Sequence, residues 1–313
     1  MYKRQVEEFV RTHPNWIIAR SSGEAEKALA QGKRVLVLSL ESAAYVVEKE
    51  EDLVEFIDQR GIRIVNLLHL TDDEFGGVAF LGGAKNLSSP FAALGNLFSG
   101  NRGEGGVRAN GRGLTDVGRA MAHSLIDRGV WLDLAHASDA AQTELLPMLE
   151  KAGHVPLYTH TVLRTHHPAE RAVSDTQLGH VKRLGGIVGL MPSEDMLKGT
   201  SVASEFCPAE QCPSGCQGGA HALATQYRDL ASRIGAESIA LGSDYNGGIP
   251  HLRPSCGTGT ALDQQGMWNI GQASEVWAAM IKLGAPVPPQ GKRVAQFLEA
   301  WKKITPQKKS QTE

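Results

Sequence analysis

The stretch VWLDLAH, residues 130–136, is a nearly continuous run of apolar side chains that ends on a histidine. The stretch VPLYTH, residues 155–160, has the same character, and helical sequence between Ser138 and Gly153 separates the two. Serine is favoured at the start of a helix, and glycine is favoured just after its end. Continuous apolar runs of this length are typical of parallel strands buried on both faces. Together these segments predict a strand–helix–strand unit.

The same alternation extends over most of the chain. Six clear strands are expected, at residues 34–41, 62–69, 130–136, 155–160, 186–191 and 238–244, and residues 16–20 are a candidate seventh. Strands that alternate with helices indicate an α/β fold, either a TIM-type (β/α) barrel or a doubly wound sheet. A closed barrel of this type needs eight strands, which is more than the sequence provides.

Composition excludes several classes of protein. The 313 residues are 42% hydrophobic and 21% charged, as in globular domains. A formal net charge of −2 and a pI near 6.6 give no electrostatic reason to expect nucleic acid as a partner. No apolar run is long enough to cross a bilayer, so we expect no transmembrane segment. Residues 1–16 lack the apolar core of a signal peptide and instead predict an amphipathic helix.

The four cysteines lie in two loops. Cys207, Cys212 and Cys216 share a stretch rich in proline, glycine and serine, and Cys256 lies in another such stretch. Two disulfides would imply an oxidising, extracytoplasmic compartment, periplasmic or secreted. The alternative is a four-cysteine metal site, although the close cysteine pairs of zinc ribbons are absent. We favour disulfides.

Five of the six clear strands end on a side chain that can bind metal or transfer a proton. These residues are Glu41, His69, His136, His160 and Asp244. In a barrel of parallel strands the carboxyl ends meet at one face, which holds the active site. Two imidazoles and a carboxylate are suitable ligands for a catalytic zinc ion with an open position for water.

Each of these residues also has a structural interpretation. A lone histidine at a strand end can hydrogen-bond a neighbouring loop, and Glu41 can cap helical sequence that opens at Ser42. A purely structural interpretation must, however, explain five coincidences at one face. We therefore expect the five residues to converge on one site.

Four blocks of sequence make a resemblance specific. They are residues 113–139 (GLTDVGRAMAHSLIDRGVWLDLAHASD), 155–161 (VPLYTHT), 170–175 (ERAVSD) and 241–248 (LGSDYNGG). In their order and spacing they resemble the membrane (renal) dipeptidase family of the amidohydrolase superfamily, over most of the chain. The resemblance implies a TIM-type barrel of the amidohydrolase type. It also implies hydrolysis of dipeptides or similar small acylamino acids, with two zinc ions in the complete enzyme.

The resemblance also assigns roles to individual residues. Glu41 matches the glutamate that bridges the two zinc ions, and His136 and His160 match the two histidines of the second zinc. His69 matches the histidine that assists at the substrate carbonyl. Arg171 matches the arginine that binds the substrate carboxylate, and Asp244 matches the aspartate that shuttles the proton.

One departure from the family concerns the first zinc. Family members open with a strand that ends in a His-x-Asp pair, and no such pair occurs in this sequence. We therefore expect the first strand or strands to be missing, and this chain to hold at most one zinc ion well. Residues 1–304 would form a single barrel domain that is incomplete at its N-terminus, followed by a polar tail at 305–313.

Three alternatives remain open at this stage. A degenerate barrel could serve as a non-catalytic binding protein, and another amidohydrolase chemistry, such as deamination or lactone hydrolysis, is not excluded by fold alone. Arg171 favours a substrate with a carboxylate, but on spacing alone it could be a surface arginine paired with Glu170 or Asp175. A small dipeptide is the expected partner, and a homodimer is compatible with the resemblance.

Overall fold

The computed structural model describes residues 2–81, 101–200, 219–245 and 248–307. Its centre is a six-stranded sheet in which every neighbouring pair of strands is parallel. The strands are β3 (Ser39–Glu41), β4 (Ile64–Asn66), β5 (Trp131–Asp133), β6 (Leu157–Thr161), β7 (Ile187–Leu190) and β8 (Ile239–Leu241). Their spatial order follows the sequence. A doubly wound sheet reverses its order at a switch point, so this order is that of a TIM-type barrel.

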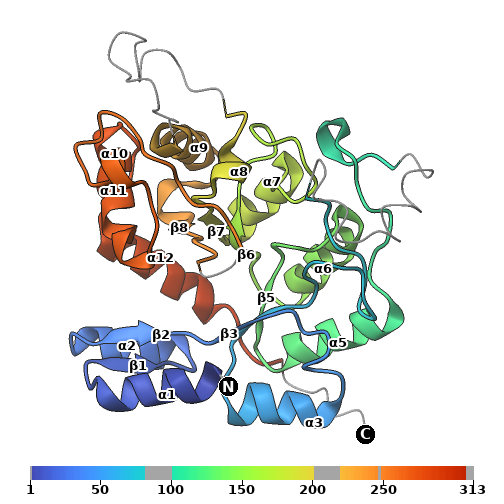
Figure 1. The fold of residues 1–313 in the computed structure, drawn as a ribbon. Helices are drawn as coiled ribbons and strands as arrows, with labels where there is room; N and C mark the ends of the chain where they lie inside the picture. The colour runs from blue at the N-terminus through green and yellow to red at the C-terminus, as the bar shows by residue number, and fades with distance from the viewer. Residues whose placement is uncertain (1, 82–100, 201–218, 246–247, 308–313) are drawn as a thin grey trace, which may run out of the picture.

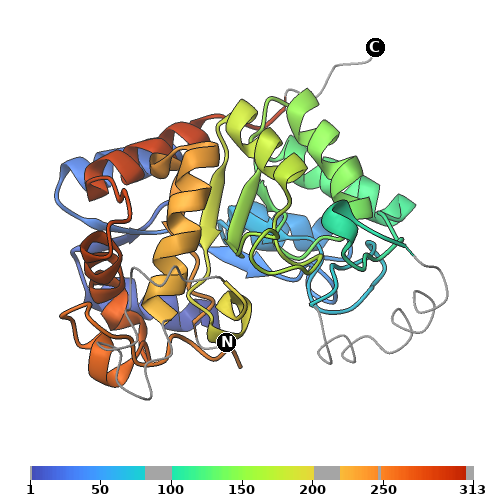
Figure 2. The ribbon, with the colours of Figure 1, turned by 90° about the horizontal axis from the view of Figure 1, so that it is seen from above.

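Helices connect the strands and lie around the outside of the sheet (Figures 1 and 2). The four long connecting helices are α5 (Asp116–Asp127), α6 (Asp139–Lys151), α7 (Asp175–Leu184) and α9 (Gly219–Ile234). The shorter helical segments are α3 (Glu50–Leu53), η1 (Val54–Gln59), η3 (Glu104–Gly106), α8 (Glu194–Leu197) and η4 (Ala236–Ser238). After β8 come α10 (Leu262–Gln265), η5 (Ile270–Gln272), α11 (Ala273–Lys282) and α12 (Gln290–Lys302). Ser138 caps α6 as predicted, because its side chain accepts a hydrogen bond from the Ala141 amide.

The strand expected at residues 34–41 is divided between two sheets. Its first half, β2 (Arg34–Leu36), pairs with β1 (Trp16–Ile18), whereas its second half is β3 of the central sheet. The small sheet lies with α1 (Tyr2–Thr12) and α2 (Ser22–Ala30) to one side of the central sheet, where α12 packs against α2 (Figure 1). The candidate seventh strand exists, but it belongs to this separate sheet.

The described strands do not close a barrel. Among them, none pairs with the outer edges of β3 or β8. A largely apolar cavity of about 890 Å³ lies between β8 and the small sheet, with Trp16, Val35, Ile239 and Phe297 among its walls. The architecture shown is therefore an α/β fold with a parallel sheet in barrel order. Within the described residues, no helix combines the length and apolar character that a membrane-spanning segment needs.

The central strands are buried on both faces but are shorter than predicted. Every residue of β4, β5 and β7 is buried, as expected of a parallel sheet covered by helices. Glu41 ends β3 as predicted, whereas His160 is the last residue but one of β6. His69, His136 and Asp244 instead lie three residues beyond the ends of β4, β5 and β8. These side chains stand on loops that leave the carboxyl edge of the sheet.

Candidate metal centre

Three side chains meet at the carboxyl ends of the central strands. The Nε2 atoms of His136 and His160 are 2.8 Å apart. Glu41 Oε1 lies 3.3 Å from each of these nitrogens. Of the described residues, these three form the one group in which at least three His, Cys, Asp or Glu side chains bring ligand atoms within 4.8 Å of one another. The strand order thus brings together side chains that are far apart in the sequence.

The triangle formed by these three atoms fits a small divalent cation. Its sides allow one point to lie about 2.0–2.2 Å from every corner, the usual range for zinc bound by histidine and carboxylate. The His136 and His160 side chains are only 7% exposed, whereas that of Glu41 is 39% exposed. An ion held here would therefore be enclosed on the histidine side and open on the carboxylate side, as in catalytic zinc sites that keep a position for water.

The surroundings of the two imidazoles keep them neutral. Burial, reinforced by the nearby positive charge of Arg171, lowers the pKa of His160 to about 2. The same two causes lower the pKa of His136 well below its usual value. A histidine binds metal through the lone pair of a neutral ring. Both side chains therefore present ligand atoms without first having to lose a proton.

His69 lies beside the triangle. Its Nε2 atom is 3.5 Å from Glu41 Oε1, and its ring meets that of His136 edge-on, with 4.6 Å between centroids. Burial is the main cause that lowers the pKa of His69; the charge of Glu41 raises this pKa, and the charge of Arg171 lowers it. The His69 side chain is 28% exposed, so it is more accessible than the paired histidines. It can therefore contact a molecule that enters from the open side.

Arg171 is a buried cation directed at the two histidines. It is only 4% exposed. Its Nη2 donates to the His160 carbonyl oxygen at 2.9 Å and lies 3.3 Å from His136 Nε2. Its Nη1 is also buried and has no hydrogen-bond partner among the described residues. The alternative of a surface arginine is wrong, because Asp175 pairs with Arg233 instead and the Glu170 carboxylate binds backbone amides.

Burial lowers the pKa of Arg171 to about 10, so the guanidinium stays charged at neutral pH. An unpartnered buried donor beside a cluster of ligand atoms needs an explanation, because leaving such a group unsatisfied costs about 1–3 kcal/mol. A carboxylate would satisfy it through a charge-assisted hydrogen bond. Arg171 is thus well suited to bind an anionic group next to the triangle.

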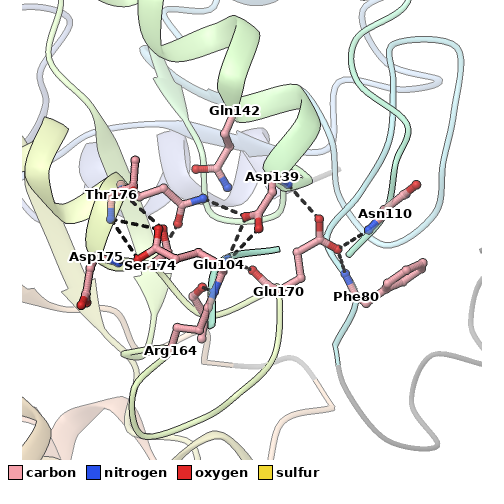
Figure 3. A network of polar contacts seen from close by, with 12 residues as sticks. Phe80, Glu104, Asn110, Asp139, Gln142, Arg164, Glu170, Ser174, Asp175 and Thr176 are labelled. Carbon is pink, nitrogen blue, oxygen red and sulfur yellow. Dashed lines mark hydrogen bonds and ion pairs between the residues drawn. The ribbon is translucent and has the colours of Figure 1, made fainter. Parts of the chain in front are cut away.

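A polar network holds the loop that carries Arg171 (Figure 3). The Glu170 carboxylate accepts hydrogen bonds from the backbone amides of Phe80, Asn110 and Asp139, at 2.8–2.9 Å. Asp139 in turn accepts two hydrogen bonds of 2.8 Å from Arg164. The loop is joined in this way to three other chain segments that are distant in sequence. No local sequence pattern predicts this role for Glu170 or Arg164.

Asp244, on the loop after β8, interacts electrostatically with Glu41 and Arg171 of the site. Burial raises the pKa of its carboxyl to about 6; the Glu41 charge acts in the same direction, whereas Arg171 and His251 oppose it. Its backbone is left-handed, with φ at 48°, which is uncommon for a residue other than glycine. His251, which the sequence did not distinguish, donates from Nε2 to the Ser243 carbonyl oxygen at 2.7 Å. This contact places His251 next to the proposed proton carrier.

The sequence profile of the membrane dipeptidases, Peptidase family M19, matches residues 3–253 of the chain. The chain belongs to this family. The resemblance inferred from the sequence is therefore confirmed, and the parallel sheet in barrel order is the fold expected of an M19 protein. Membership in a metallopeptidase family also implies metal ions, for which the triangle of Glu41, His136 and His160 is the candidate site among the described residues.

Individual relatives agree with the family assignment. Dipeptidase ataJ from Aspergillus terreus is 23% identical over 245 residues, which are 77% of this chain and 54% of that protein. The chain thus spans about half the length of the curated relative it matches. The structure is similar to that of a metallo peptidase from Rhodobacter sphaeroides, which was solved with a phosphinate mimic of the dipeptide L-Ala-D-Ala. The two superpose with a TM-score of 0.67 at 16% sequence identity, over 96% of this chain and 72% of that protein. An amidohydrolase from Pseudomonas aeruginosa gives a TM-score of 0.62 at 16% identity, covering 97% and 84%.

Proposed function

We propose that this chain carries the catalytic part of a zinc-dependent dipeptidase, which hydrolyses the amide bond of dipeptides or similar small acylamino acids. The observation that carries the proposal is the position of Arg171. Its buried guanidinium lies beside the triangle of Glu41, His136 and His160, with Nη2 3.3 Å from His136 Nε2, and its Nη1 has no hydrogen-bond partner among the described residues. A metal site next to a buried cation suits a substrate with an amide carbonyl and, a few bonds away, a carboxylate. A dipeptide has both groups.

The side chains present have distinct roles in this proposal. Glu41, His136 and His160 would hold the metal, and bound zinc would supply Lewis-acid chemistry, which activates water and polarises a carbonyl. His69, accessible beside Glu41, would donate a hydrogen bond to the oxygen on which negative charge develops. Arg171 would fix the substrate carboxylate and thereby orient the amide.

Asp244 would carry the proton. Its carboxyl has a pKa raised to about 6, close to neutral, which suits a group that accepts a proton and then returns it. It would take the proton of the attacking water and deliver it to the leaving amine. Its electrostatic interactions with both Glu41 and Arg171 support a position between the metal site and the bound substrate.

We further propose that the complete enzyme uses two zinc ions, of which this chain holds at most one. The triangle offers ligands for one ion, and the sequence contains no His-x-Asp pair. The other ligands would then come from residues outside this sequence. We use the term full-length enzyme for the protein that includes those residues, and we expect the chain alone to be nearly inactive.

The zinc-loaded full-length enzyme should cleave unblocked dipeptides to free amino acids, which amino-acid analysis would detect. A chelator should abolish this activity, and added zinc should restore it. Lactones and amino-substituted heterocycles offered in parallel should not react. Turnover of either of those classes with dipeptides left intact would instead indicate another amidohydrolase chemistry. Tight zinc binding without any turnover would indicate a non-catalytic binding protein.

We also propose an extracytoplasmic location, on the basis of cysteine usage. Cys256 is disulfide-bonded, and no described cysteine is free. The other three cysteines, at 207, 212 and 216, lie outside the described residues. Disulfides persist in oxidising compartments, so titration of the native protein with a thiol reagent should find no free thiol. Four reactive thiols would contradict this proposal and favour the cytoplasm or the cysteine metal site.

A further inference from the structure

A buried carboxylate lies directly behind one of the two histidines. Asp133, the last residue of β5, is only 4% exposed. Its Oδ1 accepts hydrogen bonds from the backbone amides of Ala135 and Thr159, at 3.1 and 3.0 Å. Its Oδ2 accepts a short hydrogen bond from the Thr159 hydroxyl. Asp133, on β5, thus contacts Thr159 on the neighbouring strand β6, and Thr159 directly precedes His160.

The Thr159 hydroxyl also contacts the ring of His160. Its oxygen is 2.8 Å from His160 Nδ1. A hydroxyl has one proton to donate, and this proton is directed to the Asp133 carboxylate. The Thr159 oxygen is therefore left as an acceptor for His160 Nδ1–H. The ring proton then resides on Nδ1 and the lone pair on Nε2, which lies 3.3 Å from Glu41 Oε1. In the metal-free chain this lone pair accepts a hydrogen bond from His136 Nε2–H, 2.8 Å away, and a bound cation would take the place of that proton.

We propose that Asp133 and Thr159 are positioning residues that set the tautomer of His160 and so prepare Nε2 to bind the metal. Neither residue touches the proposed ion or the substrate; they act through the imidazole. His136 has a different environment, because the backbone of His69 interacts with its ring. The side-chain relay from Asp133 through Thr159 therefore concerns His160 alone.

The relay predicts a specific effect of changing one atom. An Asp133→Asn substitution keeps the oxygen that accepts from the two backbone amides but places an NH₂ group against the Thr159 oxygen. The threonine hydroxyl must then donate to His160 Nδ1, which moves the ring proton to Nε2. The metal-binding lone pair is lost without loss of a buried hydrogen bond. A Thr159→Val substitution removes the relay, whereas Thr159→Ser retains it.

The first readout is independent of metal and of activity. In the metal-free chain, two-bond ¹H–¹⁵N spectra of labelled histidine, with His160 assigned by its loss in a His160→Gln variant, should show the Nδ1–H tautomer. Asp133→Asn should convert His160 to the Nε2–H tautomer, and Thr159→Ser should leave it unchanged. Thr258→Val is the matched control, because it deletes another buried threonine-to-aspartate hydrogen bond, of 2.7 Å to Asp263.

The second readout is zinc affinity, measured by competition with a chromophoric chelator. Loss of a hydrogen bond that supports a ligand typically weakens metal binding about 10–100-fold, and we expect this of Asp133→Asn and Thr159→Val but not of Thr159→Ser or Thr258→Val. Thermal unfolding identifies any variant that fails to fold. If one does, the Thr159→Ser variant and the tautomer spectra of the folded variants still test the proposal. An Nε2–H tautomer in the unaltered chain, or one unchanged by Asp133→Asn, would overturn the proposal. The affinity readout rests on the proposed metal site. If no zinc bound while the tautomer switched as expected, the proposed zinc-dependent function would be wrong and the proposed relay would be confirmed.

Discussion

Replacing Asp244 with asparagine should lower kcat of the full-length enzyme about 10²–10⁴-fold, the usual contribution of a positioned acid or base. Asparagine has nearly the same shape but cannot accept a proton, so substrate binding should change far less than turnover. Steady-state kinetics on a simple dipeptide would measure both. Asp73→Asn is the matched control, because burial raises the pKa of Asp73 to about 6 as well, and its carboxylate hydrogen-bonds the backbone amides of Phe75 and Gly76.

The pH profile gives this prediction a second signature. The Asp244 carboxylate accepts a proton only when it is ionised, a form that is lost as the pH falls through its pKa of about 6 in the metal-free chain. A bound cation favours the ionised form, so the acid limb of kcat/KM should lie at about pH 6 or below. The limb should disappear in the Asp244→Asn variant. Equal loss of activity in the two aspartate variants would remove Asp244 from the mechanism.

An Arg171→Lys substitution should separate two kinds of substrate. Lysine keeps the charge but cannot form the paired hydrogen bonds that a guanidinium makes with a carboxylate. A charge-assisted hydrogen bond contributes about 1.5–3 kcal/mol, so kcat/KM for dipeptides with a free carboxyl terminus should fall roughly 10–100-fold. Dipeptide amides, which lack this carboxylate, should lose little. Comparison of matched free and amidated dipeptides measures the difference.

The control for this variant is another buried arginine on the same loop. Arg164 is 6% exposed and binds Asp139, away from the triangle of ligands. Arg164→Lys should affect both substrate forms equally, through stability alone. If Arg171→Lys also reduced activity on both forms by the same factor, Arg171 would not bind the substrate carboxylate. The dipeptidase proposal would then lose its main support.

The sequence predicted the parallel order of the sheet because buried parallel strands appear as continuous apolar runs. It placed the candidate ligands correctly at the carboxyl edge, since Glu41 and His160 lie at strand ends. It overestimated strand length near His69 and His136, because apolar character continues into the buried loops that follow β4 and β5. Residues 34–41 are divided between two sheets, because β2 pairs with β1 and β3 pairs with β4. This division depends on tertiary pairing, which a continuous apolar run does not reveal.

The polar supports of the site were harder to predict. Asp133 stands in the middle of the apolar stretch VWLDLAH, and a charged residue inside a buried strand is a signal that a partner exists. The identity of that partner, Thr159, depends on the register between β5 and β6. Glu170 looked like a surface partner for Arg171, but its carboxylate binds backbone amides from loops far away in sequence. Contacts of this kind have no local pattern.

The metal centre is tested most directly by the zinc stoichiometry of the 313-residue chain, measured by equilibrium dialysis and elemental analysis. We predict one tightly bound zinc ion per chain and no second, with tight binding lost in His160→Ala and in Glu41→Ala. His123→Ala, which removes an exposed histidine on α5, should leave binding unchanged. Two tightly bound ions, or binding that survives the loss of His160, would contradict the metal centre described for Glu41, His136 and His160.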